Sequence, residues 1–204
     1  MYARSTTIKG DPGAIDAGIS LIRDEILPAV TAMDGCLGMS LVVDRETGRC
    51  IATTSWETEE AMSASREQVQ SFRSRASEIL GGSPEVEEWE VAVMHRDHTS
   101  RVGSCCRVTW TRAKDLDTTV DYWRTTLLPM FEEMEGFCSA SMLVDRAGGR
   151  TCGTLTFDSR AALDATREQA AAIRERAARD VGVEFLDIAE FDLAMAHLRL
   201  PELV

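Results

Sequence analysis

The chain has 204 residues and a formal net charge of −12, with 34 acidic side chains against 22 basic ones. Nucleic acids and anionic membrane surfaces are bound mainly through clustered Lys and Arg, so this balance argues against both as primary partners. The N-terminal residues lack the apolar run of a secretion signal, and no later stretch approaches the ~18 apolar residues that span a bilayer. We therefore expect a cytoplasmic protein with no nucleic-acid and no membrane partner.

The cysteines give little sign of chemistry. None of the six belongs to a Cys-x-x-Cys pair, and most lie in strand-like runs. In such runs a reduced Cys behaves as a small buried hydrophobe. The spacing therefore predicts no disulfide framework, no zinc knuckle and no metal site.

From Pro28 onward the first half of the chain recurs in the second half with a constant offset of 101 (129 − 28). Pairs of identical residues at this offset include Pro28/Pro129, Gly35/Gly136, Ser40/Ser141, Asp44/Asp145, Gly48/Gly149 and Arg66/Arg167. Such self-similarity indicates two copies of one module, each of a common domain size. We predict modules over residues 1–99 and 104–198, followed by a C-terminal tail of residues 199–204.

In the first module, residues 4–9 read as a strand, and Asp11-Pro12 has the cap and first-turn residues of a helix. Apolar residues then recur at helical spacing, at Ile15, Ile19, Ile22, Ile26, Val30 and Met33. In the second module the corresponding face includes Trp123, which this pattern assigns to the helix core. Pro28 and Pro129 fall inside the pattern, so each helix is expected to kink or restart there.

Residues 37–43 and 49–56 read as a β-hairpin with Gly48 at its turn. A second helix begins near Thr58 and stops at the Gly-Gly-Ser-Pro of residues 81–84, and a last strand covers residues 86–95. The second module repeats this order with strands at 138–144, 151–157 and 188–197 and a helix that begins near Ser159.

The order strand, helix, strand, strand, helix, strand is that of a ferredoxin-like module, in which both helices cover one face of an antiparallel sheet. The open faces of two such sheets can cover each other. The expected fold is therefore α+β, with two tandem ferredoxin-like modules that form an intramolecular α/β barrel. The chain would be a pseudo-dimer by itself, and further homo-oligomerisation stays open.

The segment from Gly136 to Glu168, GFCSASMLVDRAGGRTCGTLTFDSRAALDATRE, resembles the central hairpin and second helix of the antibiotic biosynthesis monooxygenase family, within the dimeric α/β barrel superfamily. The shared features are a Gly before the second strand, an Asp near the hairpin turn, an aromatic residue that ends the third strand, and Ala in the first turn of the second helix. In the first module these places are taken by Gly35, Asp44, Trp56 and Ala61. Members usually pair two separate chains, so this chain resembles a tandem form.

The resemblance implies several chemistries, because the superfamily includes cofactor-free oxygenases of polycyclic aromatics, haem-degrading enzymes and small isomerases. Haem-degrading members hold the iron through a His of the second helix, and neither second helix here contains a His. We therefore expect no cofactor. No catalytic set of the family transfers as a whole.

A cofactor-free oxygenase needs a base that deprotonates its substrate, and a His of near-neutral pKa suits that role. His95 and His197, equivalent residues at an offset of 102 (197 − 95), are the predicted catalytic residues. The alternative is that both are strand-end residues packed on the helix side. Carboxylates on the opposite face of the same strands, such as Glu88 and Glu190, could serve as bases if they point inward, or form an ordinary solvated edge.

Aromatic rings can stack on a planar ligand, and an indole N–H can bind an oxyanion. The predicted substrate-binding residues are Trp56, Trp110, Phe157, Ser40 and Ser141. Trp56 has Phe157 as its counterpart, and Trp110 has Lys9 if the offset of 101 holds through the first strand. Packing in the core is the alternative for each aromatic residue.

The sequence favours a protein that binds a small aromatic molecule, with cofactor-independent monooxygenase chemistry on an aromatic or polyketide-like substrate as the leading enzymatic hypothesis. It does not decide whether the protein is an enzyme. The rival hypothesis is a non-catalytic ligand-binding or protein-interaction scaffold of the same fold, which the lack of a recognisable catalytic set supports.

Overall fold

The computed structural model describes residues 1–204 and divides into two compact units. Unit 1 comprises Met1–Trp89 and Leu193–Leu200, and unit 2 comprises Glu90–Asp192 and Pro201–Val204. The two units are defined by contacts between residues, whereas the two sequence repeats follow one another along the chain. The last strand of each repeat therefore begins in one unit and ends in the other.

The first repeat contains β1 (Tyr2–Lys9), α1 (Ile15–Leu21), α2 (Leu27–Thr31), β2 (Cys36–Asp44), β3 (Arg49–Trp56), α3 (Glu59–Ala64), α4 (Arg66–Leu80) and β4 (Pro84–Arg96). The second contains β5 (Cys105–Arg112), α5 (Leu116–Tyr122), α6 (Leu128–Glu132), β6 (Phe137–Asp145), β7 (Arg150–Phe157), α7 (Arg160–Ala165), α8 (Arg167–Val181) and β8 (Glu184–Leu198). In unit 1, β3 pairs antiparallel with β1 and β2. In unit 2, β7 pairs antiparallel with β5 and β6, β5 with β8, and β6 with β4. The α+β class and the two ferredoxin-like modules are thus confirmed.

The strand register corrects one sequence alignment. β1 pairs Arg4 with Thr54, and β5 pairs Arg107 with Leu155. Since Thr54 and Leu155 differ by 101 (155 − 54), Arg107 is the counterpart of Arg4 and the offset in the first strand is 103 (107 − 4). Trp110 therefore corresponds to Thr7 and not to Lys9. The physical reason is a shorter connection between the first strand and the first helix of the second repeat.

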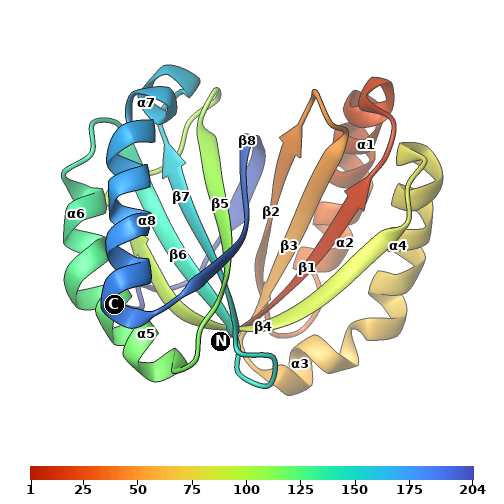
Figure 1. Ribbon diagram of the computed structural model, residues 1–204. Helices are drawn as coiled ribbons and strands as arrows, with labels where there is room; N and C mark the ends of the chain where they lie inside the picture. Colours follow the sequence, from red (N-terminus) through yellow and green to blue (C-terminus); the bar gives the residue numbers. More distant parts are fainter. The chain divides into compact units, whose positions relative to one another are not determined.

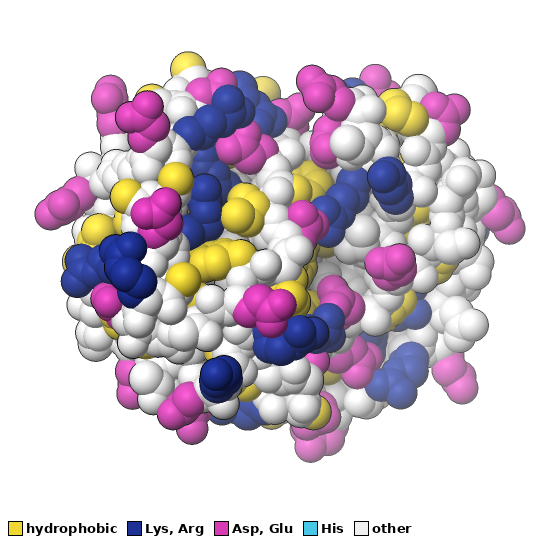
Figure 2. Space-filling model, viewed as in Figure 1, with side chains coloured by type: hydrophobic (Ala, Val, Ile, Leu, Met, Phe, Trp, Pro, Cys, Tyr) yellow, Lys and Arg dark blue, Asp and Glu magenta, His cyan; other side chains and the backbone are white.

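Within each unit the helices cover one face of the strands (Figure 1). In unit 1 a core cluster of buried apolar residues joins α1, α2 and α4 to the strands, with Trp56 fully buried. In unit 2 the equivalent cluster contains Trp123, Phe131 and the fully buried Phe157. On the face seen in Figure 2, basic side chains lie among acidic ones and do not form a single charged patch.

Each first helix changes its winding just before a proline. Ile22–Ile26 and Trp123–Leu127 form π-helical turns, and Pro28 and Pro129 follow in the next α-helical segment. A π-helical turn accommodates the hydrogen bond that proline cannot donate. None of the helices combines the length and the apolar character that crossing a membrane requires.

The duplicated glycine before the second strand has a steric cause. Gly35 and Gly136 have φ of 73° and 74°. A Cβ at Gly35 would lie 2.6 Å from Cβ of Ala61, and one at Gly136 would lie 2.7 Å from Cβ of Ala162. The Gly and Ala of the repeat are therefore one packing unit, which brings the start of the second strand against the first turn of the second helix.

Candidate functional site

Unit 2 contains a crevice between its helices and the strand face that they cover, here called the unit 2 crevice. Its cavity volume is about 90 Å³. Thr109, Thr111 and Gly153 line it from the strands, while Trp123 and Arg174 line it from the helices. The walls are otherwise mainly apolar, which is the usual make-up of a small-molecule site.

Gly153 on β7 opens space in front of Trp123. A Cβ added at Gly153 would lie 3.8 Å from Nε1 of Trp123, an ordinary van der Waals contact. The glycine is therefore not required by backbone strain, and its missing methyl group leaves room beside the indole. The counterpart of Gly153 in unit 1 is Ala52.

Trp123 offers an unused hydrogen-bond donor to this space. Its side chain is 8% exposed and packs edge to face on Phe131, with 5.4 Å between the ring centroids. Its indole Nε1 has no acceptor in the structure. This N–H is free to donate to a ligand oxygen that enters the crevice.

Two threonine hydroxyls lie across neighbouring strands on the crevice floor. Oγ1 of Thr111 and Oγ1 of Thr151 are 2.7 Å apart, and both residues are buried. One hydroxyl donates and the other accepts, so the pair retains spare hydrogen-bonding capacity toward a ligand. In unit 1 the same places are taken by Ile8 and Cys50.

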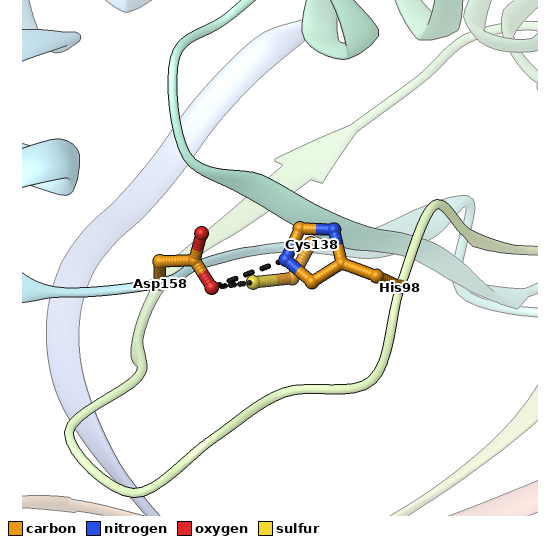
Figure 3. Close-up of side chains that lie close together, drawn as sticks. All are labelled: His98, Cys138 and Asp158. Carbon is orange, nitrogen blue, oxygen red and sulfur yellow. Dashed lines mark hydrogen bonds and ion pairs between the residues drawn. The ribbon is translucent and has the colours of Figure 1, made fainter.

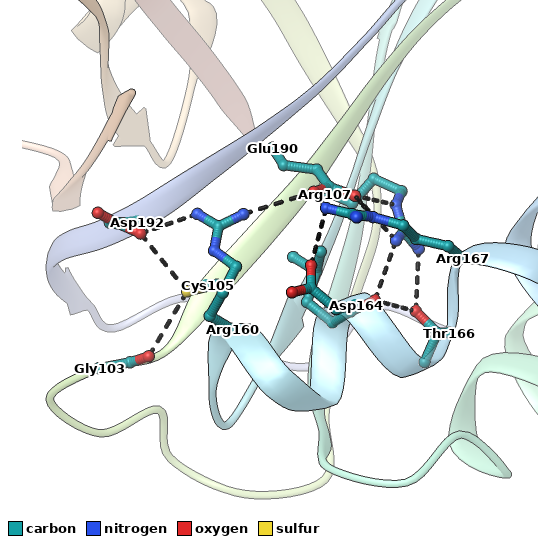
Figure 4. A network of polar contacts seen from close by, with 10 residues as sticks. Gly103, Cys105, Arg107, Arg160, Asp164, Thr166, Arg167, Glu190 and Asp192 are labelled. Carbon is teal, nitrogen blue, oxygen red and sulfur yellow. Dashed lines mark hydrogen bonds and ion pairs between the residues drawn. The ribbon is translucent and has the colours of Figure 1, made fainter. Parts of the chain in front are cut away.

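Arg107, which is 3% exposed, also lines the crevice. Its guanidinium donates to Glu190 Oε1 at 3.0 Å, to Thr166 Oγ1 at 3.0 Å and to the carbonyl of Leu163 at 3.1 Å. Figure 4 shows Glu190 also facing Arg160 and Arg167. The guanidinium of Arg107 is thus held in place by partners on β8, on α7 and at the junction between α7 and α8.

This network bears on the idea of a carboxylate base. Burial pushes the pKa of Glu190 up, but the hydrogen bonds from Arg167 and Arg107 outweigh burial and hold the pKa below its ordinary value. Glu88 in unit 1 behaves in the same way toward Arg4 and Arg66. Both carboxylates are therefore kept ionised as partners of arginine, and neither lines a crevice.

Arg174 on α8 is the free cation of the unit 2 crevice. No acceptor contacts its guanidinium. Burial and, after it, the charge of Arg107 lower the pKa of Arg174. Both effects would be relieved by an anion, so the crevice presents an indole N–H and a guanidinium to the same ligand.

The unit 1 crevice, which has the same position in its own unit, differs in its lining. Its cavity volume is about 50 Å³. Ile22 replaces Trp123 there, and Ile8 replaces Thr111. Arg73, the counterpart of Arg174, has two buried nitrogen atoms, Nε and Nη2, without a partner. The two crevices thus share a cation and one threonine, Thr6 or Thr109, whereas the indole and the hydroxyl pair occur only in unit 2.

The predicted catalytic histidines lie outside both crevices. His95 stacks on Phe137, and its Nε2 is 2.8 Å from Glu132 Oε1. His197 is exposed, and its carbonyl oxygen lies against Gly38. The structure does not bring the two histidines to a shared pocket within either unit, and a catalytic role for them stays a prediction.

The predicted binding residues are likewise not gathered around the unit 2 crevice. Trp56 and Phe157 are fully buried in the two cores. Successive strand residues point to opposite faces, so Trp110 lies on the other face of β5 from Thr109 and Thr111. Ser40 and Ser141 alternate in the same way with crevice residues of β2 and β6. Their roles in binding also stay predictions.

Sequence reasoning placed Trp123 in the core and left out its polar edge. The signal was present in the repeat, because Trp123 stands where the first half has Ile22, Gly153 stands for Ala52, and Thr151 stands for Cys50. The three residues line the same crevice only when the helix packs on the sheet. Spacing within a single element could not show that.

Comparison with known proteins gives consistent matches. A family model described as antibiotic biosynthesis monooxygenase matches residues 1–76. Rv2557, an uncharacterised protein of Mycobacterium tuberculosis (strain ATCC 25618 / H37Rv), is 53% identical over 206 residues, a match that covers 100% of this chain and 92% of that protein.

Two solved structures share the fold. A "putative monooxygenase" from Lactobacillus acidophilus NCFM is similar with a TM-score of 0.70 at 9% identity, over 97% of this chain and 96% of that one. An anthrone oxidase-like protein is similar with a TM-score of 0.65 at 17% identity, over 100% of this chain and 94% of that one. At such identities the likeness concerns the fold alone.

Proposed function

The chain belongs to the antibiotic biosynthesis monooxygenase family, and we propose that its unit 2 crevice binds a small phenol and oxidises it with dioxygen, without a bound cofactor. The observation that carries this proposal is the unpartnered indole N–H of Trp123 beside the unpaired guanidinium of Arg174. The anthrone oxidase-like neighbour adds an analogy of fold.

The crevice holds no His, Cys, Asp or Glu side chain that could remove a proton. The positive charge of Arg174 and the donor of Trp123 instead favour the ionised form of a bound phenol, because both stabilise a negative oxygen. The phenol then releases its proton to solvent on binding and becomes the phenolate. The ring of a phenolate is electron-rich and reacts with dioxygen much more readily than that of a neutral phenol.

The proposed reaction balances with dioxygen as the sole oxidant. The ring carbon opposite the phenolate oxygen forms a bond to one oxygen atom of O₂, and the other oxygen atom takes up a proton to give a hydroperoxide. The O–O bond then breaks as the hydrogen on that carbon leaves together with hydroxide, as water. A carbonyl remains, so the phenol becomes a quinone, with one oxygen atom in the product and one in water.

The size of the crevice narrows the substrate class. A cavity of about 90 Å³ is far below the roughly 300 Å³ at which drug-sized pockets begin. A single-ring phenol therefore suits the crevice better than a polycyclic one. The hydroxyl pair of Thr111 and Thr151 can receive a second polar substituent of the ring.

The test is binding and oxygen consumption by the full chain with single-ring phenols, hydroquinones and a polycyclic anthrone for comparison. Trp123→Phe removes the indole donor and should weaken phenol binding about tenfold, the worth of one hydrogen bond. Trp110→Phe is the matched control, because that indole lies on the opposite strand face, and it should bind like the wild type.

Loss of binding in Trp110→Phe but not in Trp123→Phe would contradict the proposed site. Trp110 would then be the binding residue, as the sequence predicts. If phenol binding depended on Trp123 but no oxygen were consumed, the oxygenase activity would be excluded. The protein would then be a non-catalytic ligand-binding protein. Thermal unfolding of each variant shows whether its fold is intact.

A further inference from the structure

Unit 2 contains a second group of functional side chains, which we call the His98 cluster: His98, Cys138 and Asp158 (Figure 3). Nε2 of His98 lies 3.1 Å from Oδ1 of Asp158, and Sγ of Cys138 lies 3.4 Å from the same oxygen. One ligand atom from each of the three residues lies within 4.8 Å of the other two. None of the three lines the unit 2 crevice.

The cluster is held by the backbone as well as by its side chains. The amide groups of Asp97 and His98 donate to the carbonyl of Cys138 at 2.9 and 3.3 Å. The amide of Asp158 donates to the carbonyl of Gly136 at 2.8 Å. Three separate segments, the connection after β4, the start of β6 and the end of β7, are therefore fixed at one point.

We propose that the His98 cluster is a binding site for one Zn²⁺ ion or a similar divalent transition-metal ion. Imidazole nitrogen, thiolate sulfur and carboxylate oxygen are the protein ligands that Zn²⁺ takes. Tetrahedral coordination at ordinary bond lengths separates N from O by about 3.4 Å and S from O by about 3.6 Å. The two hydrogen-bonded separations in the structure are slightly shorter than these, and the imidazole nitrogen and the sulfur lie within 4.8 Å of each other.

The surroundings of His98 match those of a metal ligand. Its second ring nitrogen, Nδ1, lies 2.8 Å from Oδ2 of Asp97. A carboxylate at this place orients a ligating imidazole and increases its basicity. The His98 and Asp158 side chains are 32% and 38% exposed, which gives an ion a path from solvent, while Cys138 is fully buried. A water molecule would complete the coordination from the exposed side.

Binding exchanges protons for the metal. Burial, followed by the nearby Asp158 carboxylate, raises the pKa of the Cys138 thiol to about 12. In the free cluster the Cys138 sulfur and Nε2 of His98 both face Oδ1 of Asp158. The ion replaces the thiol proton and the proton on Nε2, and both are released to solvent.

The first repeat provides a built-in comparison. Cys138 corresponds to Leu37, and Asp158 corresponds to Glu57. Cys36 and His197 both approach Gly38 beside Leu37, but unit 1 has no group of histidine, cysteine and carboxylate ligand atoms close enough together to hold an ion. The proposal predicts one ion per chain and not two.

The experiment uses the full chain after treatment with a chelator. Equilibrium dialysis against Zn²⁺ should give one bound ion per chain, and Co²⁺ should give a thiolate-to-metal charge-transfer band in the near ultraviolet. Cys138→Ser and His98→Gln should each lose the band and at least tenfold in affinity. Cys106→Ser is the matched control, since Cys106 is also buried, lies on β5 with β7 between it and β6, and can keep its contact with Thr156 Oγ1 as a serine.

A second readout does not depend on cobalt. Zn²⁺ should raise the midpoint of thermal unfolding of the wild type and of Cys106→Ser, because the ion binds only the folded cluster. It should leave Cys138→Ser and His98→Gln unchanged. No stoichiometric binding by the wild type would overturn the proposal, as would equal binding by Cys138→Ser or a band that disappears in Cys106→Ser.

Discussion

The crevices of unit 1 and unit 2 have the same frame and different linings. In each unit a buried arginine of the first strand, Arg4 or Arg107, donates to a glutamate of the last strand and to a carbonyl of the second helix region. Around this frame, the unit 1 crevice has Ile22, Ile8 and Cys50 where the unit 2 crevice has the indole of Trp123 and the hydroxyl pair of Thr111 and Thr151. The two repeats thus share the buried arginine that stabilises the fold and differ in the side chains that can contact a ligand.

The shared arginine frame should dominate stability, because Arg4 and Arg107 are only 1% and 3% exposed. Glu190→Gln leaves Arg107 without its countercharge and should lower the free energy of unfolding by about 3 kcal/mol. Glu88→Gln should cost less, since Glu88 is 35% exposed against 21% for Glu190 and water can take its place. Urea unfolding of the two variants measures the difference.

Glu90→Gln is the control for a glutamate on a surface pair. Glu90 contacts Arg146, which is 51% exposed, so the loss should stay below about 1 kcal/mol. A larger loss for Glu88→Gln than for Glu190→Gln would show that water does not replace Glu88 as its exposure suggests.

The pair of Arg107 and Glu190 should make the free energy of unfolding depend on pH, and the sign follows from the pKa of Glu190. Partial burial raises its pKa, but the hydrogen bonds of Arg167 and Arg107 outweigh this, so the folded-state pKa lies below the unfolded value of about 4.3. The stabilisation is present above that pH and is lost as the pH falls through the folded pKa. Wild type and Glu190→Gln should therefore converge in unfolding free energy at acid pH. A gap that stays constant from neutral to acid pH contradicts this assignment.

The fold of the two modules could be predicted from the sequence. The repeat, the helical and strand periods and the turn glycines predicted both modules, because each depends on local spacing. The counterpart of Trp110 could not be predicted in this way. The connection before α5 is two residues shorter than the one before α1, so the offset of 101 does not hold in the first strand. A gap inside a repeat leaves no local signal in a single sequence.

The site was harder to predict for a different reason. The pattern assigned Trp123 to the helix core, and the ring does pack there. Its donor became visible only when Gly153 was placed opposite, on a strand about 30 residues later. The His98 cluster has the same character, because its three residues are separated by 40 (138 − 98) and 20 (158 − 138) positions and show no metal-binding spacing.

The hydroxyl pair on the unit 2 floor should behave as a unit. Thr111→Val leaves the Thr151 hydroxyl buried without its partner and should cost about 1–2 kcal/mol, and Thr151→Val should do the same. The double variant should cost clearly less than the sum, because it removes both polar groups and resembles the apolar floor of unit 1. Additive losses in a double-mutant cycle would show that each hydroxyl has its own partner elsewhere.

The smallest change in stability should come from exchanging the residue that opens the crevice. Gly153→Ala places a methyl group at ordinary contact distance from the Trp123 indole, so it should leave stability unchanged or raise it by up to about 1 kcal/mol. The same methyl group occupies the space a phenol oxygen needs beside Nε1, so phenol binding should fall several-fold. Calorimetric titration and urea unfolding measure the two effects separately.

The reverse exchange in unit 1, Ala52→Gly, enlarges that crevice without adding a donor. Ile22 stands where unit 2 has Trp123, so the variant should lose about 1 kcal/mol of stability and gain no phenol site. If Ala52→Gly gained a second phenol site, cavity space alone would decide binding. The indole and the hydroxyls of unit 2 would then not be what distinguishes the two crevices.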